Sequence, residues 1–143
     1  MKANRFFESG LPEVLWLLPF ETSGPSFDVR SEYVEMLWLP VLGPSATWLA
    51  RRLGTLAAAF PQGTWIETVE LSVSIGLGAG HGLLTRSLHR LLMFSAAVVE
   101  PGDVLRVRTR LGPVSERSLE RLPPVLVAEH HRMCALLRSC AAA

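Results

Sequence analysis

The sequence predicts an α+β fold in which helices predominate, and three observations support this prediction. Apolar residues recur at three- and four-residue spacing in several segments between residues 31 and 96, which is the period of an amphipathic helix. Apolar residues and arginines then alternate from Val104 to Leu111, which is the period of a strand. The length of 143 residues suits one domain with a single hydrophobic core.

The first 30 residues are expected to form an N-terminal arm. Proline and glycine interrupt this region, an apolar stretch extends from Leu11 to Phe20, and a linker-like polar segment extends from Glu21 to Ser26. We expect the arm to pack against the body of the chain or against another subunit. Residues 31–143 are expected to form the folded domain, which includes a C-terminal helix.

Two helices are predicted at the start of this domain. Ser31 is a suitable N-cap for the first helix, which Pro40 is expected to end because proline has no amide hydrogen for a helical bond. Pro44 suits the first turn of the second helix. Its apolar residues recur at helical spacing from Trp48 to Phe60, and Pro61 follows.

A short third helix is predicted over residues 66–75, before the glycine-rich segment Gly76–Gly82. Glycine permits the positive φ angles that a tight reversal needs. A fourth helix is predicted over residues 83–96, with leucines on one side and polar residues on the other. A hairpin with a turn at Glu100–Asp103 follows, and a last helix is expected from about residue 124 to residue 141.

Helix, helix, glycine turn, helix and hairpin is the element order of a winged helix-turn-helix. In such a domain the helix over residues 83–96 enters the major groove of double-stranded DNA, and residues 99–112 form the wing. Five arginines and only two acidic residues lie between positions 81 and 114. The residues predicted to contact DNA are Thr85, Arg86, His89 and Arg90 on the helix and Arg106, Arg108 and Arg110 on one face of the wing strand.

A simpler interpretation of these arginines stays open. An edge strand with three arginines on one face commonly presents a solvated surface that discourages pairing with other strands. Arg86 and Arg90 are four residues apart, a spacing found on the surface of many helices. All but one of the basic residues are arginine, which favours bidentate contacts to phosphate or guanine but also arises from GC-rich genomic composition.

Three motifs carry a resemblance to known proteins: Trp38–Pro44, Arg86–Leu91 and Arg121–Pro124. The segment from Tyr33 to Leu53 resembles the opening helices of the winged-helix domains in the primosomal DnaD and DnaB proteins of Gram-positive bacteria. All three motifs resemble those of small uncharacterised actinobacterial proteins, and the similarity extends over roughly residues 31–132. The resemblance implies a winged-helix fold and a module that oligomerises and associates with DNA.

The composition predicts a partner surface. Hydrophobic residues make up 49% of the chain and charged residues only 19%, so more apolar surface must be covered than a small monomer easily hides. We expect a homodimer whose interface includes Trp16, Leu17, Trp38 and Trp48. The alternative to DNA binding is a protein-protein interaction adaptor that uses the winged-helix fold without contacting DNA.

No cofactor, no metal site and no enzymatic activity are predicted. His130 and Cys134 share a helix face, but two ligands do not make a zinc site. The glycine-rich segment lacks the Lys-Ser/Thr of a phosphate-binding loop, and no Gly-x-Ser-x-Gly motif is present. The apolar runs are too short for a membrane span, and the N-terminus does not have the pattern of a signal peptide. We therefore expect a cytoplasmic protein with free cysteines that acts in transcription regulation or replication.

Overall fold

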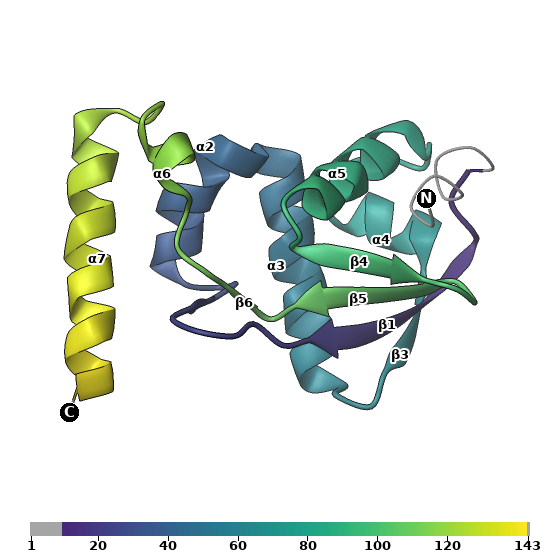
Figure 1. The fold of residues 1–143 in the computed structure, drawn as a ribbon. Helices are drawn as coiled ribbons and strands as arrows, with labels where there is room; N and C mark the ends of the chain where they lie inside the picture. The colour runs from purple at the N-terminus through teal and green to yellow at the C-terminus, as the bar shows by residue number, and fades with distance from the viewer. Residues whose placement is uncertain (1–9, 143) are drawn as a thin grey trace.

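A four-stranded mixed sheet organises the fold in the computed structural model, which describes residues 10–142 (Figure 1). Its strands stand in the order β3 (Thr64–Glu67), β1 (Val14–Phe20), β5 (Val104–Arg108) and β4 (Ala97–Glu100). β1 is parallel to β5, whereas β3 and β4 pair antiparallel with their neighbours. About half of the residues are helical, and the expected α+β class is confirmed.

Residues 14–20 of the segment that we expected to form an arm instead supply an internal strand, and residues 1–9 of that segment lie outside the described residues. β1 lies between β3 and β5, and the side chains of Leu15 and Leu17 are 1% and 0% exposed. Pro19 does not prevent this pairing, because β3 pairs with β1 only as far as Leu17 and leaves one edge of β1 open beyond it. A second short pair, β2 (Phe27–Asp28) with β6 (Arg110–Leu111), extends this connection.

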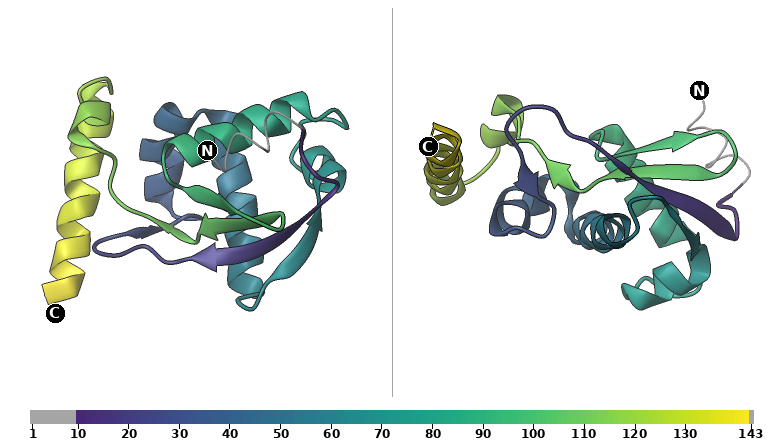
Figure 2. Two further views of the ribbon diagram at one scale, coloured as in Figure 1. Left: turned by 45° about the vertical axis from the view of Figure 1, so that its right-hand side comes forward. Right: turned by 90° about the horizontal axis from the view of Figure 1, so that it is seen from below.

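Helices cover one face of the sheet. α3 (Pro44–Ala59) packs against β1 and β5, and α5 (Gly82–Met93) packs against α3 and β4 (Figure 2). Both helices turn apolar side chains toward the sheet, as the spacing of their leucines predicts. The main core contains buried leucines from the two helices and the central strands: Leu15, Leu17, Leu49, Leu53, Leu84, Leu88, Leu91 and Leu105.

The third predicted helix, over residues 66–75, is wrong in its first part. Thr64–Glu67 pair with β1 as β3, and α4 (Thr68–Ser74) begins only after them. Glu67 marks this boundary because its extended backbone ends the strand while its carboxylate accepts hydrogen bonds from the backbone N–H groups of Val69 and Glu70. A side chain that caps the first turn of a helix fixes where the helix begins.

Pro40 does not end the first predicted helix. The π-helical segment η1 (Val34–Trp38) continues into α2 (Leu39–Leu42), with Pro40 in the first turn of α2. Proline is tolerated in a first turn because its missing amide hydrogen has no helical partner there. The predicted hairpin of β4 and β5 is confirmed, and its turn contains Gly102 and Asp103 at φ angles of 87° and 58°.

α3 approaches a neighbouring segment closely at Gly54. A Cβ atom added to Gly54 would lie 2.3 Å from Cγ1 of Val29, whose side chain is buried. It would also lie 3.6 Å from the backbone oxygen of Arg108. This position therefore excludes a side chain, although glycine is a poor residue for a helix interior.

We expect Gly54→Ala to lower the free energy of unfolding by about 1–3 kcal/mol, because the buried Val29 must move. Helix propensity alone predicts the opposite, a gain of about 1 kcal/mol. Urea denaturation measures the difference. The control is Gly80→Ala, where an added Cβ meets nothing within 4 Å. A Gly54→Ala protein as stable as the wild type would contradict the close approach.

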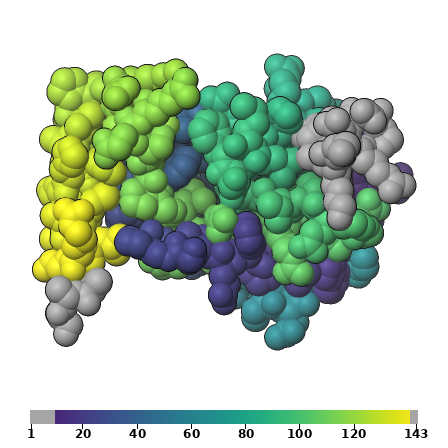
Figure 3. Space-filling view, in the orientation of Figure 1, coloured from purple at the N-terminus to yellow at the C-terminus, as the bar shows by residue number. Residues whose placement is uncertain are grey.

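A second, smaller core holds the C-terminal helices. α6 (Glu116–Leu119) and α7 (Pro124–Ala142) lie beside η1, away from the four-stranded sheet, and α7 stands at the outer edge of the molecule (Figures 1 and 3). The buried residues of this core come from η1, α6, α7 and the segments next to them: Tyr33, Leu37, Val114, Leu119, Met133 and Cys134.

A hydrogen-bonded pair, Tyr33 and His130, connects α7 to the body. The Tyr33 ring stacks on Phe27 with centroids 3.8 Å apart, and its hydroxyl lies 2.8 Å from Nδ1 of His130. The same hydroxyl accepts a hydrogen bond of 2.9 Å from the Val114 N–H, so its own hydrogen is directed to His130. Burial raises the pKa of Tyr33 to about 12. His130 therefore acts as an acceptor at Nδ1, which requires its neutral form.

We expect acidification to weaken the folded state through His130. Burial, with a smaller effect from His131, lowers the pKa of His130 below its ordinary value. The unfolded chain binds a proton first, so this stabilisation is complete above a pH of about 6.5 and is lost as the pH falls toward the lowered pKa. Urea denaturation between neutral and mildly acidic pH measures the loss. His130→Gln should reduce this pH dependence, and an unchanged dependence in this variant would contradict the role of His130.

Candidate nucleic-acid interface

α5 exposes a polar face without acidic residues. Arg86 and His89 are exposed and Thr85 is half-buried, while the leucines of the helix face the core. No Asp or Glu occurs in the sequence from Leu71 to Val99. Arg86 therefore places a positive charge on the exposed side of α5.

Arg86 lines a shallow groove between α5 and the beginning of α3. The groove has a volume of about 230 Å³, and Gly43, Pro44 and Ser45 line its other side. No side chain caps the first turn of α3, because Gly43 occupies the N-cap position. The end of the helix dipole adds partial positive charge there. Arg86 and the start of α3 thus favour the same kind of ligand, an anion such as a DNA phosphate.

Arg90 binds within the chain. Its Nη2 donates to the carbonyl oxygen of Val41 at 2.8 Å, and its Nε donates to that of Leu42 at 3.2 Å. The guanidinium carbon also lies 5.6 Å from the centre of the Phe94 ring. These carbonyls belong to the last turn of α2, which carries partial negative charge. Arg90 therefore fixes α5 against α2, although its side chain remains partly open to solvent.

Arg108 connects three segments of the chain. Its Nε donates to the carbonyl oxygen of Ser95 at 2.7 Å, and its Nη1 donates to the carbonyl oxygen of Glu21 at 2.6 Å. Nη1 also donates to Oγ1 of Thr22 at 3.1 Å, and the guanidinium carbon lies 3.9 Å from the centre of the Phe20 ring. Arg108 thus fastens the end of β1 to the hairpin.

The other two arginines of the predicted wing also have partners within the chain. Arg106 forms an ion pair with Glu100 on the neighbouring strand. Arg110 donates from Nε to Oγ of Ser26 and from Nη2 to the Ser26 carbonyl oxygen, both at 2.8 Å. Arg106 thus joins the two strands of the hairpin, whereas Arg108 and Arg110 hold residues 20–26 in place.

We expect Arg108→Ala to lower the free energy of unfolding by about 1–2 kcal/mol, because hydrogen bonds from a charged donor to backbone carbonyls are lost. Thermal or urea denaturation measures the change. Arg86→Ala is the matched control and should alter stability by no more than about 0.5 kcal/mol, as exposed substitutions usually do. Equal stability of the two variants would show that the contacts of Arg108 contribute little.

Two of the four residues predicted at a subunit interface contribute to the chain's own packing. Leu17 is fully buried in the main core, so its side chain is covered by the chain itself. Trp38 is half-buried and donates from Nε1 to the carbonyl oxygen of Gly112 at 2.9 Å. Its ring also meets the Phe94 ring edge-on, with centroids 6.2 Å apart. Trp38 thereby links η1 to the segment that follows the hairpin.

The other two predicted interface residues lie on separate elements. Trp16, on β1, is half-buried and meets Trp65 edge-on at 4.8 Å between ring centroids. Trp48, on α3, is 59% exposed, with the Arg51 guanidinium 5.2 Å from its ring centre. Trp65, its neighbour on β3, is 64% exposed.

The described residues also bear on the metal and membrane predictions. Among residues 10–142, no three side chains of His, Cys, Asp or Glu come together to hold a metal ion. In the same part of the chain, no helix has both the length and the apolar character of a membrane span. Cys134 and Cys140 are both free, as the sequence predicts.

Comparison with known proteins gave no match to a family model, to a curated protein or to a solved structure.

Proposed function

We propose that this chain is a DNA-binding protein of the winged helix-turn-helix type that contacts duplex DNA through α5. The exposed face of α5, with Arg86 and no acid, carries this proposal. The element order supports it: α3 is followed by β3, α4, the glycine-rich turn, α5 and the β4–β5 hairpin. β1 is an addition to the expected order, and it widens the sheet without covering the exposed face of α5.

In this proposal the polar residues of α5 have different roles. Arg86 contacts a phosphate or a guanine, and the uncapped start of α3 receives the adjacent phosphate. His89 and Thr85 meet base edges or the sugar-phosphate backbone beside it. Arg90 positions α5 through its bonds to α2. A face of this kind suits a cytoplasmic regulator of transcription or a replication-associated protein, and it requires neither catalysis nor a cofactor.

The wing has a different role from the one that its arginines first indicated. Arg106, Arg108 and Arg110 bind Glu100, backbone carbonyls and Ser26 within the chain. The turn of the hairpin also contains Asp103, whose charge repels phosphate. We therefore assign the wing arginines to the shape of the hairpin and leave the DNA contacts to α5.

A protein-protein interaction adaptor is the second candidate function. The observation that favours it is the internal use of all three wing arginines, which leaves α5 as the main positive surface of the predicted DNA-binding region. Large apolar side chains that remain exposed, among them Trp48 and Trp65, suit contacts with another protein. An apolar interface of this kind is much less sensitive to salt than phosphate contacts are.

We expect the full chain to bind a random DNA duplex at low salt, with an affinity that falls linearly on a log-log plot against salt concentration. Arg86→Ala should weaken binding by at least about fivefold and reduce the salt slope by about one, because one phosphate or base contact is lost. Fluorescence anisotropy at several salt concentrations measures both quantities.

The matched control is Arg117→Ala, an exposed arginine on α6, which should leave the affinity unchanged. Arg86→Lys should fall between Arg86→Ala and the wild type if the contact is to phosphate. An absence of binding at concentrations on the order of tens of micromolar, or an equal loss in the Arg86 and Arg117 variants, would contradict DNA binding by α5. A salt-insensitive protein partner would then support the adaptor.

A further inference from the structure

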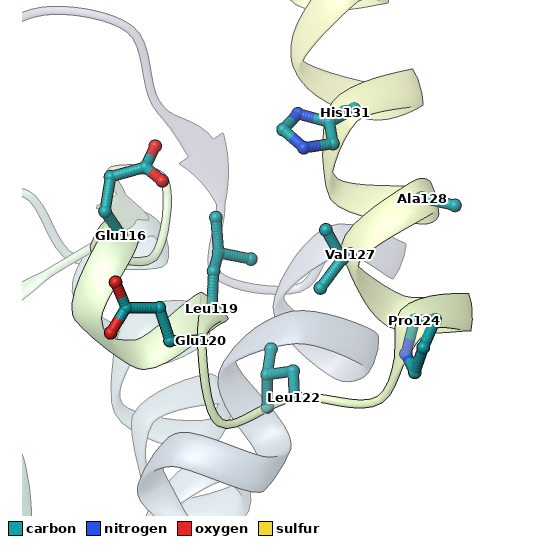
Figure 4. Close-up of a pocket in the computed structure, with 8 residues that line it drawn as sticks. All are labelled: Glu116, Leu119, Glu120, Leu122, Pro124, Val127, Ala128 and His131. Carbon is teal, nitrogen blue, oxygen red and sulfur yellow. The ribbon is translucent and has the colours of Figure 1, made fainter.

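A groove with an apolar floor and an acidic rim lies between α6 and α7 (Figure 4). It has a volume of about 580 Å³, and Leu119, Leu122 and Val127 form its apolar part. Glu116 and Glu120 stand on the α6 side, and neither forms an ion pair with another described residue. The groove therefore suits an occupant that brings an apolar surface together with a positive charge.

α7 carries large apolar side chains that the described chain does not cover. His130, Met133 and Cys134 face the small core, whereas Val125 and Leu136 are 68% and 54% exposed. The two exposed residues lie toward opposite ends of the helix. Leu136 also lines a second groove of about 320 Å³ beside the C-terminal half of α7. Each half of α7 thus has an open apolar surface beside it.

The positive charge that the first groove lacks lies on the same helix. Arg138 is exposed near the C-terminal end of α7 and forms no ion pair with another described residue. It follows His131, which lines the first groove, by about two helical turns, so both side chains lie on the same flank of α7. The acidic rim and the unpaired arginine are therefore on one flank, at opposite ends of the helix.

We propose that a second copy of this chain covers α7, with the two α7 helices antiparallel across a two-fold axis. In this arrangement Arg138 of the second copy approaches Glu120, and its Leu136 meets Val125. A two-fold axis repeats every contact, so the same pairs form at both ends of the interface. Arginine side chains on a helix lean toward its N-terminus, which brings Arg138 back over the level of the opposing groove.

The residue nearest the axis does not oppose this pairing. Arg132 lies near the middle of α7, where two copies of the same residue approach each other in a symmetric dimer. It is already paired with Glu129, with Nη2 and Oε2 2.6 Å apart. In the dimer each Arg132 therefore lies next to a Glu129, and the attraction to these carboxylates offsets the repulsion between the two arginines. The Tyr33–His130 hydrogen bond holds one side of α7 against the body of the molecule, so the opposite side of α7 faces the solvent.

Charge exchange tests the dimer and does not depend on DNA binding. Sedimentation equilibrium of the full chain over a range of concentrations should show a monomer–dimer equilibrium. Glu120→Arg and Arg138→Glu should each weaken the dimer by about tenfold, because like charges then face each other. The double variant Glu120→Arg/Arg138→Glu should recover most of the wild-type affinity, since the pair is restored in the opposite sense. Glu70→Arg, on α4, is the matched control and should leave the equilibrium unchanged.

The apolar contact has its own variant pair. Leu136→Ala should weaken the dimer, whereas Leu83→Ala, an exposed leucine on α5, should not. Circular dichroism confirms that each variant is folded, so loss of the dimer is distinguished from loss of the fold. A wild-type chain that stays monomeric at every concentration would overturn the proposal. Failure of the double variant to recover would overturn the antiparallel arrangement of α7.

Discussion

The parallel pairing of β1 with β5 is the constraint on which the rest of the structure depends. It joins a segment near the N-terminus to a strand in the second half of the chain, and it places Leu15 and Leu17 against α3. The helices gain a continuous apolar surface only because this pairing makes the sheet four strands wide. Arg108 secures the same junction because its side chain donates hydrogen bonds both to Glu21, next to the end of β1, and to Ser95, two residues before β4. Loss of β1 would therefore affect the core and the hairpin together.

The sequence predicted the elements whose pattern is local. The helical spacing of leucines in α3 and α5 and the alternation in β5 reflect one core surface beneath each element, and that surface is visible in a short window. β1 was misjudged because Pro12 and Pro19 near its ends suggested an irregular arm. The strand that pairs with Pro19 is β5, which lies far away in the sequence. The pairing partner of a parallel strand cannot be found from local periodicity.

The wing arginines show a similar limit in the predicted site. Their alternation correctly placed Arg106 and Arg108 on one strand, β5, but it also placed Arg110 there, whereas Arg110 belongs to β6. The exposed position of Arg86 was also predictable. Backbone carbonyl groups accept most of the hydrogen bonds of Arg108 and Arg110, and every residue type carries a carbonyl. No side-chain pattern could have revealed these acceptors. The three-dimensional structure was therefore needed to tell which arginines hold the chain together and which are open to a ligand.

The position of β1 between two later strands also affects how the chain folds during synthesis. The ribosome makes Leu17 about 90 residues before its parallel partner Leu105. At roughly 5–20 residues per second, β1 waits several seconds or more without the strand that completes its burial. During that interval its leucines are exposed to other chains and to chaperones. The order of synthesis thus leaves the N-terminal strand without its partner for longer than the strands of the β4–β5 hairpin, which pair soon after they are made.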